Sequence, residues 1–338
     1  MLQFQPALAD NGIKLEIQSL LGDTYLRRRF AGDSFSIREL VVSYHQRIHA
    51  LQQVNGFDLA IVHLELLPFL PGWLERRFLK IPFVYDCDDA FYLKYRQGRF
   101  RWLRPLLDTK IERMIAAAVA VTAGSSELAA YARRFNNSVT VLPSVVDTDQ
   151  MRPASSAPSR NQNPHFTVGW IGSPSTAPYL QQIVAPLQQL GRELPVRLLV
   201  VGGSAPTIPG VDVIEQSWSL EHEQSLMQEF DVGVMPLPDT AWARGKCAYK
   251  LIQCMACAIP VIASAVGANK DAVPPTCGIL VSTTDQWLVA FRQLAANPQL
   301  RKRMGASGRK WVEEHYSHRS ALPVLTRVIR QAASSSQA

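Results

Sequence analysis

The segment FDVGVMPLPDTAWARGKCAYKLIQCMACAIPVIAS, from Phe230 to Ser264, decides the fold of this chain. It opens with the strand-like FDVGVMPL and closes with PVIAS, a second short apolar run that suits a strand. Between them, apolar residues recur at helical spacing from Leu251 to Ala256 until Pro260 ends the pattern. A strand, a loop, a helix and another strand in this order are typical of an α/β protein.

The loop before the predicted helix is cationic, with Arg244, Lys246 and Lys250 close to Gly245. In α/β proteins ligands bind outside the carboxyl ends of the strands, and a helix N-terminus favours an anion there. This position therefore predicts a phosphate-bearing ligand. The alternative, which the sequence leaves open, is that the lysines are solvated surface residues.

The length of 338 residues suggests two domains of roughly 150 residues each. With 47% hydrophobic and 19% charged residues, the chain is globular, and disorder and coiled coil are excluded. The net charge of +7 favours anionic partners in general. Because zinc-finger spacings and aromatic RNA-binding motifs are missing from the sequence, we expect no nucleic-acid partner.

The sequence carries no apolar run of about 18 residues, and its start, MLQFQPALADNG, does not resemble a signal peptide. We therefore expect a cytoplasmic protein. The odd number of cysteines, 5, favours reduced thiols that act as small hydrophobes. The pair Cys254 and Cys257 lies inside an apolar helix pattern, so we expect no metal. A zinc site would need Cys247, Cys254, Cys257 and Cys277.

Apolar runs alternate with helix-like segments on both sides of a polar linker, PASSAPSRNQNP, at 153–164. This predicts a domain over 1–152, a second over 165–317, and a closing helix with a frayed tail over 318–338. Strands are expected at 57–64, 82–86, 119–124, 138–144, 165–172, 196–203, 211–216, 230–237, 260–264 and 277–282. Helices are expected to end near 12 and to cover 103–118, 125–135, 179–190, 220–229, 286–296, 301–315 and 322–333, with a helix or connection at 67–79.

The start of the chain departs from the doubly wound pattern, which begins with a strand and a glycine-bearing loop. Here a helix end comes first, and Ile13 to Ile17 reads as a strand after it. By this pattern, we expect the first strand of the first domain to be missing from the given sequence. We therefore expect the reading frame to extend upstream by roughly 20 residues, the length of one strand and its loop.

Polar residues follow a predicted strand in each half. In the second half, GWIGSPST places Gly172, Ser173 and Thr176 in a turn that could contact a phosphate or a sugar, or be an ordinary tight turn. In the first half, YDCDDA gathers three carboxylates, Asp86, Asp88 and Asp89. They either serve a binding cleft or cap a helix and pair with the cations that follow.

Those cations form a basic and aromatic segment between Phe91 and Arg113. Such a mixture suits a lipid headgroup region, which predicts contact with an anionic membrane surface on the inner face of the plasma membrane. The alternative is a solvated helix face whose cations pair with the YDCDDA carboxylates. The residues concerned are Lys94, Arg96, Arg99, Arg101, Arg104, Lys110 and Arg113, interleaved with Tyr92, Tyr95, Phe100, Trp102 and Leu103.

Several familiar catalytic motifs are missing from the sequence. VVGG at 200–203 is not the glycine pattern of a dehydrogenase, and there is no nucleophile elbow, H-E-x-x-H or Walker loop. Instead the motifs together resemble glycosyltransferase family 4, the retaining enzymes of the GT-B fold that use nucleotide-sugar donors. The segments that carry the resemblance are VYDCDDAFY, VGWIGSPST, FDVGVMPL, GKCAYKLIQCMACAIPVIAS, VGANKD and GRKWVEEHYS.

The resemblance implies two doubly wound Rossmann-like α/β domains that face a cleft. The donor would bind the second domain, a glycan or lipid-linked acceptor the first, and no metal or other cofactor is implied. The implied donor-binding residues are Gly172, Ser173, Thr176, Trp218, Gly245, Tyr249, Leu251 and Gln253. The implied catalytic residues are Lys246, Lys250 and Asp88, and the acceptor-side residues are Asp86, Asp89 and Glu65.

The chain departs from the family at two glutamates, whose places hold Gly245 and Gln253. Gln253 can still hydrogen-bond a ribose, whereas the donor-sugar contact at Gly245 is open. The usual cation after the first strand of the second domain is also missing, so Lys246 and Lys250 are expected to supply that charge. A sugar-nucleotide epimerase and a non-catalytic binding partner remain as alternatives.

Overall fold

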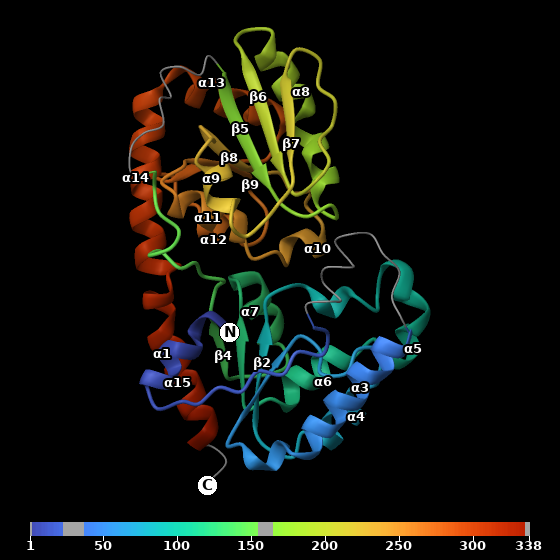
Figure 1. The fold of residues 1–338 in the computed structure, drawn as a ribbon. Helices are drawn as coiled ribbons and strands as arrows, with labels where there is room; N and C mark the ends of the chain where they lie inside the picture. The colour runs from blue at the N-terminus through green and yellow to red at the C-terminus, as the bar shows by residue number, and fades with distance from the viewer. Residues whose placement is uncertain (1, 23–36, 155–164, 335–338) are drawn as a thin grey trace. The chain divides into compact units, whose positions relative to one another are not determined.

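The computed structural model describes residues 2–22, 37–154 and 165–334 (Figure 1). Most of the expected linker and the last residues of the tail, at 155–164 and 335–338, lie outside the described residues. The chain divides into two compact units. The first unit comprises Met1–Gly124, Leu128–Leu142 and Leu322–Ala338, and the second comprises Ser125–Glu127 and Pro143–Ala321. The main division thus falls after Leu142, ten residues before the position predicted from the sequence.

The first unit contains a parallel sheet in the order β1-β2-β3-β4. Its strands are β1 (Ala60–His63), β2 (Phe83–Cys87), β3 (Ala120–Ala123) and β4 (Val139–Val141). The helices with it include α1 (Gln5–Asp10), α3 (Ile37–Gln52), α4 (Gly72–Phe78), α5 (Arg104–Leu107), α6 (Lys110–Ala117) and α7 (Ser126–Ala132). The strand predicted over Ile13 to Ile17 is wrong, because this stretch has no sheet partner among the described residues.

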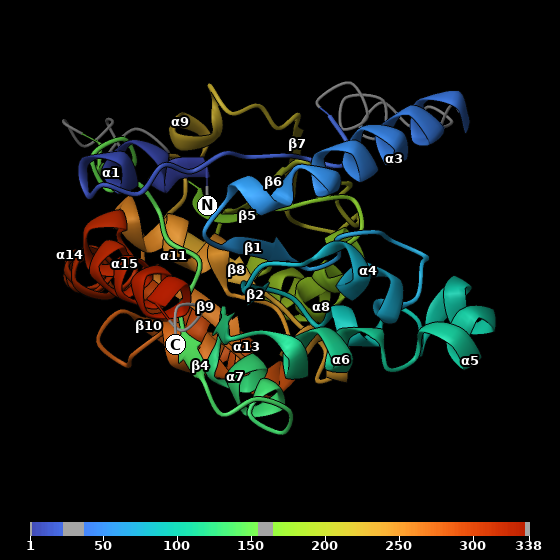
Figure 2. The same cartoon turned by 90° about the horizontal axis from the view of Figure 1, so that it is seen from below.

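The last helix, α15 (His318–Ser334), belongs to the first unit from Leu322 onward. Its Val328 and Ala332 pack in one buried cluster with Val84 of β2 and Ala120 of β3. The end of α1 lies beside it, where Arg330 Nη2 donates to the Asn11 carbonyl at 2.9 Å. Both views show the two helices as neighbours (Figure 1, Figure 2). The helix predicted over 322–333 therefore packs against one face of the first sheet.

The second unit contains a parallel sheet in the order β10-β9-β8-β5-β6-β7. Its strands are β5 (Phe166–Ile171), β6 (Val196–Val201), β7 (Asp212–Gln216), β8 (Val232–Met235), β9 (Val261–Ser264) and β10 (Gly278–Val281). The chain moves outward from β5 to β7 on one side and from β8 to β10 on the other. The strand order therefore reverses between β5 and β8, and a doubly wound sheet binds its ligand at this switch point.

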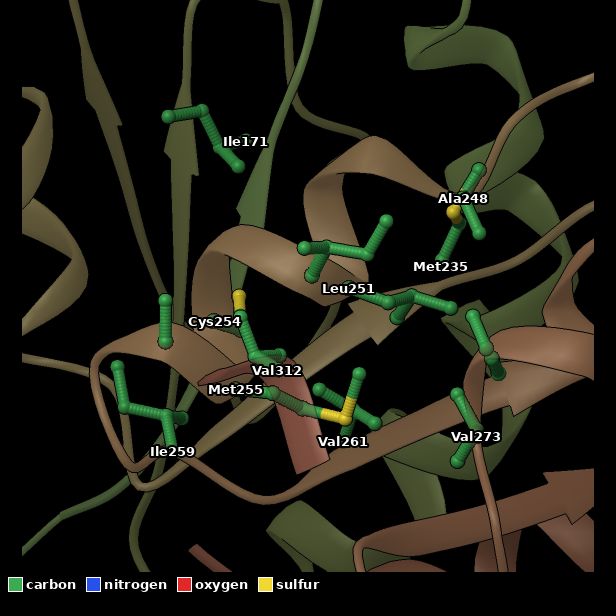
Figure 3. Close-up of a cluster of buried hydrophobic side chains, with 14 of the residues drawn as sticks. Ile171, Met235, Ala248, Leu251, Cys254, Met255, Ile259, Val261, Val273 and Val312 are labelled. Carbon is green, nitrogen blue, oxygen red and sulfur yellow. The ribbon is translucent and has the colours of Figure 1, made fainter. Parts of the chain in front are cut away.

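Alternate residues of these strands enter two different cores, because side chains point to opposite faces of a strand. In β5, Val168 and Trp170 join a cluster with α8 (Gln181–Gly191) and α13 (Thr284–Ala296), whereas Ile171 joins the other. That other cluster includes residues of α11 (Tyr249–Ala256) and α14 (Pro298–His315). Figure 3 shows Leu251, Cys254 and Met255 within it. Burial on both faces explains why these strands read as continuous apolar runs.

The remaining described helices of the second unit are short. They are α9 (Glu223–Met227), α10 (Ala241–Arg244) and α12 (Asn269–Ala272). The six strands and the longer helices of this unit were predicted from the sequence and are confirmed, with ends that move by a few residues. The α/β class with parallel sheets is confirmed as well.

Candidate functional site

The amine of Lys250 lies at the switch point of the second sheet. Lys250 stands in the first turn of α11, which starts after Ala248 in a left-handed conformation with φ 54°. Its Nζ donates a hydrogen bond of 3.0 Å to Thr176 Oγ1, in the turn that follows β5. The first turn of α11 and the turn after β5 are thus joined by one side chain.

Two residues of β5 and its turn make room for this amine. Lys250 Nζ lies 4.3 Å from the centre of the Trp170 ring, which is a cation–π distance. A Cβ atom on Gly172 would come within 2.2 Å of the same Nζ, so a side chain at this position would displace the amine. A glycine at position 172 therefore leaves the space that the Lys250 amine occupies. Trp170 was not predicted as a site residue. The signal that could have found it is an aromatic residue two positions before Gly172, at the end of a predicted strand.

The surroundings of Lys250 disfavour its own charge. Burial lowers the pKa of Lys250 to about 7, and the nearby charge of Lys246 adds to this effect. In the described parts of the chain, no carboxylate lies within ion-pair distance of its amine. A buried ammonium without a counter-ion is costly, and an anionic ligand would remove that cost. The amine thus marks a position suited to a phosphate.

The other cations of the loop have different surroundings. Arg244 Nε contacts Asp239 Oδ1 at 2.6 Å on an exposed surface. Lys246 Nζ lies 5.1 Å from the centre of the Trp242 ring. Lys250 is therefore the lysine that reaches the glycine turn, while a role for Lys246 stays a prediction.

Trp218 lies next to the same turn. A Cβ atom on Gly202 would fall 2.4 Å from the Gly172 carbonyl oxygen and 3.0 Å from Trp218 Cβ, so the three residues are neighbours. The indole is 44% exposed, and its Nε1 donates to Glu223 Oε1 at 2.8 Å. A partly exposed and fixed aromatic ring of this kind can stack on a nucleobase.

The remaining predicted donor residues differ in how accessible they are. Ser173 Oγ lies 2.9 Å from Ser175 Oγ in the glycine turn, and the Tyr249 side chain is partly exposed. Gly245 and Gln253 are buried, the latter within α11. Contrary to the prediction, the Leu251 side chain points into the core (Figure 3), and its N–H donates to the Ala248 carbonyl. Leu251 is therefore a packing residue, because helical spacing turns it away from the loop.

At the carboxyl edge of the first sheet, Asp86 accepts hydrogen bonds from two neighbouring strands. Thr122 Oγ1 donates to Asp86 Oδ1 at 2.6 Å, and His63 Nδ1 lies 3.0 Å from Asp86 Oδ2. Asp88 Oδ2 lies 3.7 Å from His63 Nε2, on the other side of the ring. Asp89 instead accepts the Ala90 N–H within its own turn. Sequence reasoning found the aspartates but missed His63, which is the last residue of β1.

Glu65 lies inside the first unit, contrary to its prediction as an acceptor contact. Its side chain is 3% exposed and pairs with Lys94 and with Lys110, the latter at 3.0 Å. Tyr95 Oη also donates to it at 2.6 Å. Burial alone would raise the pKa of Glu65, but the two lysines outweigh this and lower it. The carboxylate thus anchors the chain after β1.

In the ion pairs that the structure describes, the cations of the basic segment contact acids other than the three carboxylates of YDCDDA. Pairing with the YDCDDA carboxylates stays a prediction. Arg96 contacts Asp108 and Glu112, each at 2.5 Å. The side chain of Arg99 lies outside the described ones. Trp102 and Leu106 are 74% and 59% exposed. The segment therefore presents an apolar and cationic surface.

The cysteines form no disulfide, and Cys254, Cys257 and Cys277 are buried. Burial raises the pKa of the Cys257 thiol to about 12, so this group is neutral at physiological pH. Among the residues that the structure describes, no group of three His, Cys, Asp or Glu could hold a metal ion. No helix in the same residues has the length and apolar character needed to cross a membrane.

Two family models match this chain, and each covers a different part of it. Residues 7–150 match the family model "Glycosyltransferase Family 4", and residues 165–297 match "Glycosyl transferases group 1". No curated protein sequence matches significantly. The fold is similar to that of a sucrose-phosphate synthase from Thermosynechococcus elongatus, with a TM-score of 0.67 and 19% identity over 90% of this chain and 82% of that chain.

Two further solved structures are similar over most of both chains. A glycosyltransferase from Rickettsia africae has a TM-score of 0.67 and 12% identity over 98% of this chain and 93% of that one. HepE from Anabaena, in complex with UDP-glucose, has a TM-score of 0.63 and 15% identity over 98% and 89%. At these identities the structures show the fold. Together with the two family models, they identify the chain as a glycosyltransferase of the GT-B fold whose halves are of the family 4 type.

Proposed function

We propose that this glycosyltransferase moves a sugar from a nucleotide-diphosphate donor, bound by the second unit, to a hydroxyl group of a glycan or lipid-linked acceptor. The observation that carries the proposal is the partly buried Lys250 amine, which has a glycine turn and a helix start beside it and, among the described residues, no carboxylate within ion-pair distance. That HepE has been solved with UDP-glucose supports a nucleotide sugar as the donor.

Lys250 would bind the donor diphosphate and stabilise the charge that builds on it as the sugar leaves. Such an interaction is stronger in the transition state than in the ground state, so it raises turnover more than it tightens binding. Ser173 and Thr176 would add hydroxyl contacts, Trp218 would lie against the base, and Gln253 would meet the ribose. Lys246 is the second candidate for the diphosphate.

We also propose that the sugar is transferred with retention, as the family resemblance implies. The acceptor hydroxyl would then attack from the face that the diphosphate leaves. Proton NMR of the product formed from an α-linked donor measures this directly. A β-linked product would contradict retention while leaving the proposed transfer intact.

The experiment for the transfer itself starts with a thermal-shift screen of UDP, UDP-glucose, UDP-galactose, UDP-N-acetylglucosamine and GDP-mannose. A ligand that binds the folded state raises the melting temperature by mass action. With the best donor, Lys250→Ala should lower turnover by about a hundredfold and weaken donor binding less, and Lys246→Ala should act in the same direction. Lys302→Ala is the control, because Lys302 is exposed on α14. Full turnover in both loop variants would place the site elsewhere.

We propose in addition that the first unit contacts an anionic membrane surface, where a lipid-linked acceptor would be found. Exposed Trp102 and Leu106 lie in one short segment with exposed Arg101 and Arg104. Aromatic and cationic side chains in this mixture favour the headgroup region.

A further inference from the structure

A groove on the first unit runs along the last helix. It lies between α15 and the end of α1 and has a volume of about 390 Å³, which is within the range of small-molecule sites. Both views show these two helices side by side (Figure 1, Figure 2). Asn11 forms the α1 wall, and the whole groove belongs to the first unit. The α15 wall is one stripe of residues at helical spacing, made of Leu322, Pro323, Thr326, Arg327, Arg330 and Gln331.

The stripe is cationic and has no acid to balance it. Arg327 and Arg330 are exposed and three positions apart, so they are neighbours on the helix surface. Residues 318–334 contain no Asp or Glu, and in the part of the chain that the structure describes no ion pair joins either arginine to Asp10 of α1 or to another acid. Arg330 Nη2 donates to the Asn11 carbonyl at 2.9 Å, which uses one N–H group of its guanidinium. The other donors of the two side chains are left for a ligand.

The wall of the groove also holds a buried hydroxyl group without a hydrogen-bond partner. Thr326 is 8% exposed, and its Oγ1 has no partner among the described residues. Most buried hydroxyl groups in proteins are paired, because an unpaired one costs free energy. An oxygen atom of a ligand in the groove would supply the missing partner. The cations and this hydroxyl therefore favour the same kind of ligand, one with several acceptor oxygens.

We propose that this groove binds the phosphate monoester of a small molecule, such as a sugar phosphate. A phosphate monoester carries about two negative charges at neutral pH and three acceptor oxygens, which two arginines and a hydroxyl group can match. Guanidinium groups hold phosphate through paired N–H bonds, so they select by geometry as well as by charge. Leu322 and Pro323, at the other end of the stripe, would contact the carbon skeleton of the ligand. The inference is independent of donor binding by the second unit.

A ligand in this groove would hold the end of α1 against α15. The N–H groups of Asn11 and Gly12 donate to carbonyl groups in the last turn of α1. Amide exchange at these positions requires this end of the helix to open, and a ligand that contacts both helices makes opening less frequent. Bound ligand should therefore slow the exchange of these two amides.

The test is isothermal titration calorimetry of the whole chain with glucose 6-phosphate, inorganic phosphate and glucose. We expect glucose 6-phosphate to bind best. Inorganic phosphate should bind more weakly because it lacks the carbon skeleton, and glucose should not bind because it lacks the charge. Hydrogen exchange of the wild-type protein with glucose 6-phosphate locates the site, through slower exchange at Asn11 and Gly12.

Arg327→Gln and Arg330→Gln should each weaken the binding of glucose 6-phosphate by about tenfold or more, since each variant loses charged hydrogen-bond donors. Thr326→Val keeps the shape of the side chain and removes the hydroxyl group. It should weaken binding while leaving thermal stability unchanged or higher. Arg319→Gln is the matched control, because it removes the same charge from an exposed arginine of α15 outside the groove. Lys250→Ala, in the second unit, should bind glucose 6-phosphate as the wild type does.

Any of three results would overturn the inference without touching donor binding, which is measured separately with UDP. The first is that glucose 6-phosphate does not bind, or binds no better than glucose. The second is an equal loss of binding in Arg319→Gln and in the two groove variants, which would make the attraction a property of total charge. The third is binding that Lys250→Ala loses and the groove variants keep.

A second arm of the experiment uses vesicles of phosphatidylcholine with phosphatidic acid, which carries the same phosphate monoester on a lipid. We expect Arg327→Gln and Arg330→Gln to sediment with these vesicles to the same extent as Arg319→Gln. If instead the two groove variants lose vesicle binding and the wild type does not bind glucose 6-phosphate, the groove takes a lipid headgroup and not a small molecule in solution.

Discussion

At the scale of single residues, Lys250 illustrates how a binding site can work against the stability of the empty protein. Its pKa is about 7 in the folded protein, because of burial, and 10.5 is the ordinary value expected in the unfolded chain. Between these values the unfolded chain holds more protons, so stability rises with pH. The penalty from this group is therefore fully present below pH 7 and disappears toward pH 10.5.

This predicts that Lys250→Met stabilises the protein in the absence of ligand. The gain should be large at pH 6, at most about 5 kcal/mol on the scale of 1.4 kcal/mol per pKa unit, and much smaller at pH 9. Thermal unfolding at the two pH values measures it. Lys302→Met, at an exposed lysine, should show no such dependence. An equal effect of Lys250→Met at both pH values would mean that its ammonium is not buried in solution.

At the scale of elements, two glycines of α14 set its distance from α11. A Cβ atom on Gly305 would lie 2.0 Å from the Ala258 carbonyl oxygen, which is backbone and cannot move alone. A Cβ atom on Gly308 would lie 3.1 Å from Met255 Cγ, which is part of a flexible side chain. The two positions differ in what the added methyl group meets.

We therefore predict opposite outcomes for the same substitution on one helix. Alanine is favoured over glycine in a helix by about 1 kcal/mol, so Gly308→Ala should be close to neutral or stabilising. Gly305→Ala should be destabilising by about 1 to 3 kcal/mol, because overpacking outweighs that gain. Urea unfolding of the two variants makes the comparison. Equal stabilities would show that α14 can shift away from α11 without cost.

The elements also show what could be predicted from the sequence. Strands buried on both faces read as apolar runs, so β5 to β10 were found. The helix predicted over 103–118 is instead broken into α5 and α6, because Arg96 binds the side chain and the carbonyl of Asp108 between them. The helix α3 was not predicted at all.

The candidate site, like the elements, could be predicted from the sequence only in part. Lys250 and Gly172 could be found because a cationic loop and a glycine turn each follow an apolar run. His63 and Trp170 could not, because their roles depend on strand register and on side chains from distant segments. Glu65 was misplaced for a related reason, since its partner Lys110 lies 45 positions away and is fully buried. Local pattern thus predicts elements better than it predicts contacts.

At the scale of the whole molecule, the net charge of +7 and the exposed cations give long-range attraction to anionic surfaces. This attraction alone would be weak and sensitive to salt, because exposed charges are screened within about 8 Å at physiological ionic strength. Trp102 and Leu106, exposed beside Arg101 and Arg104, could add an apolar contribution that salt does not remove. The two contributions can be measured separately.

We predict that the protein sediments with vesicles of phosphatidylserine and phosphatidylcholine, and not with vesicles of phosphatidylcholine alone. Replacing Arg101 and Arg104 by Ser should weaken binding by roughly 1 kcal/mol for each cation lost, about tenfold or more in total, and most strongly at low salt. Trp102→Ser should weaken it at every salt concentration. The matched control replaces Arg76 and Arg77, two exposed arginines of α4, and changes the net charge equally. If both double variants lose binding to the same extent, the attraction is a property of the total charge, and the segment around Trp102 is not a membrane-contacting surface.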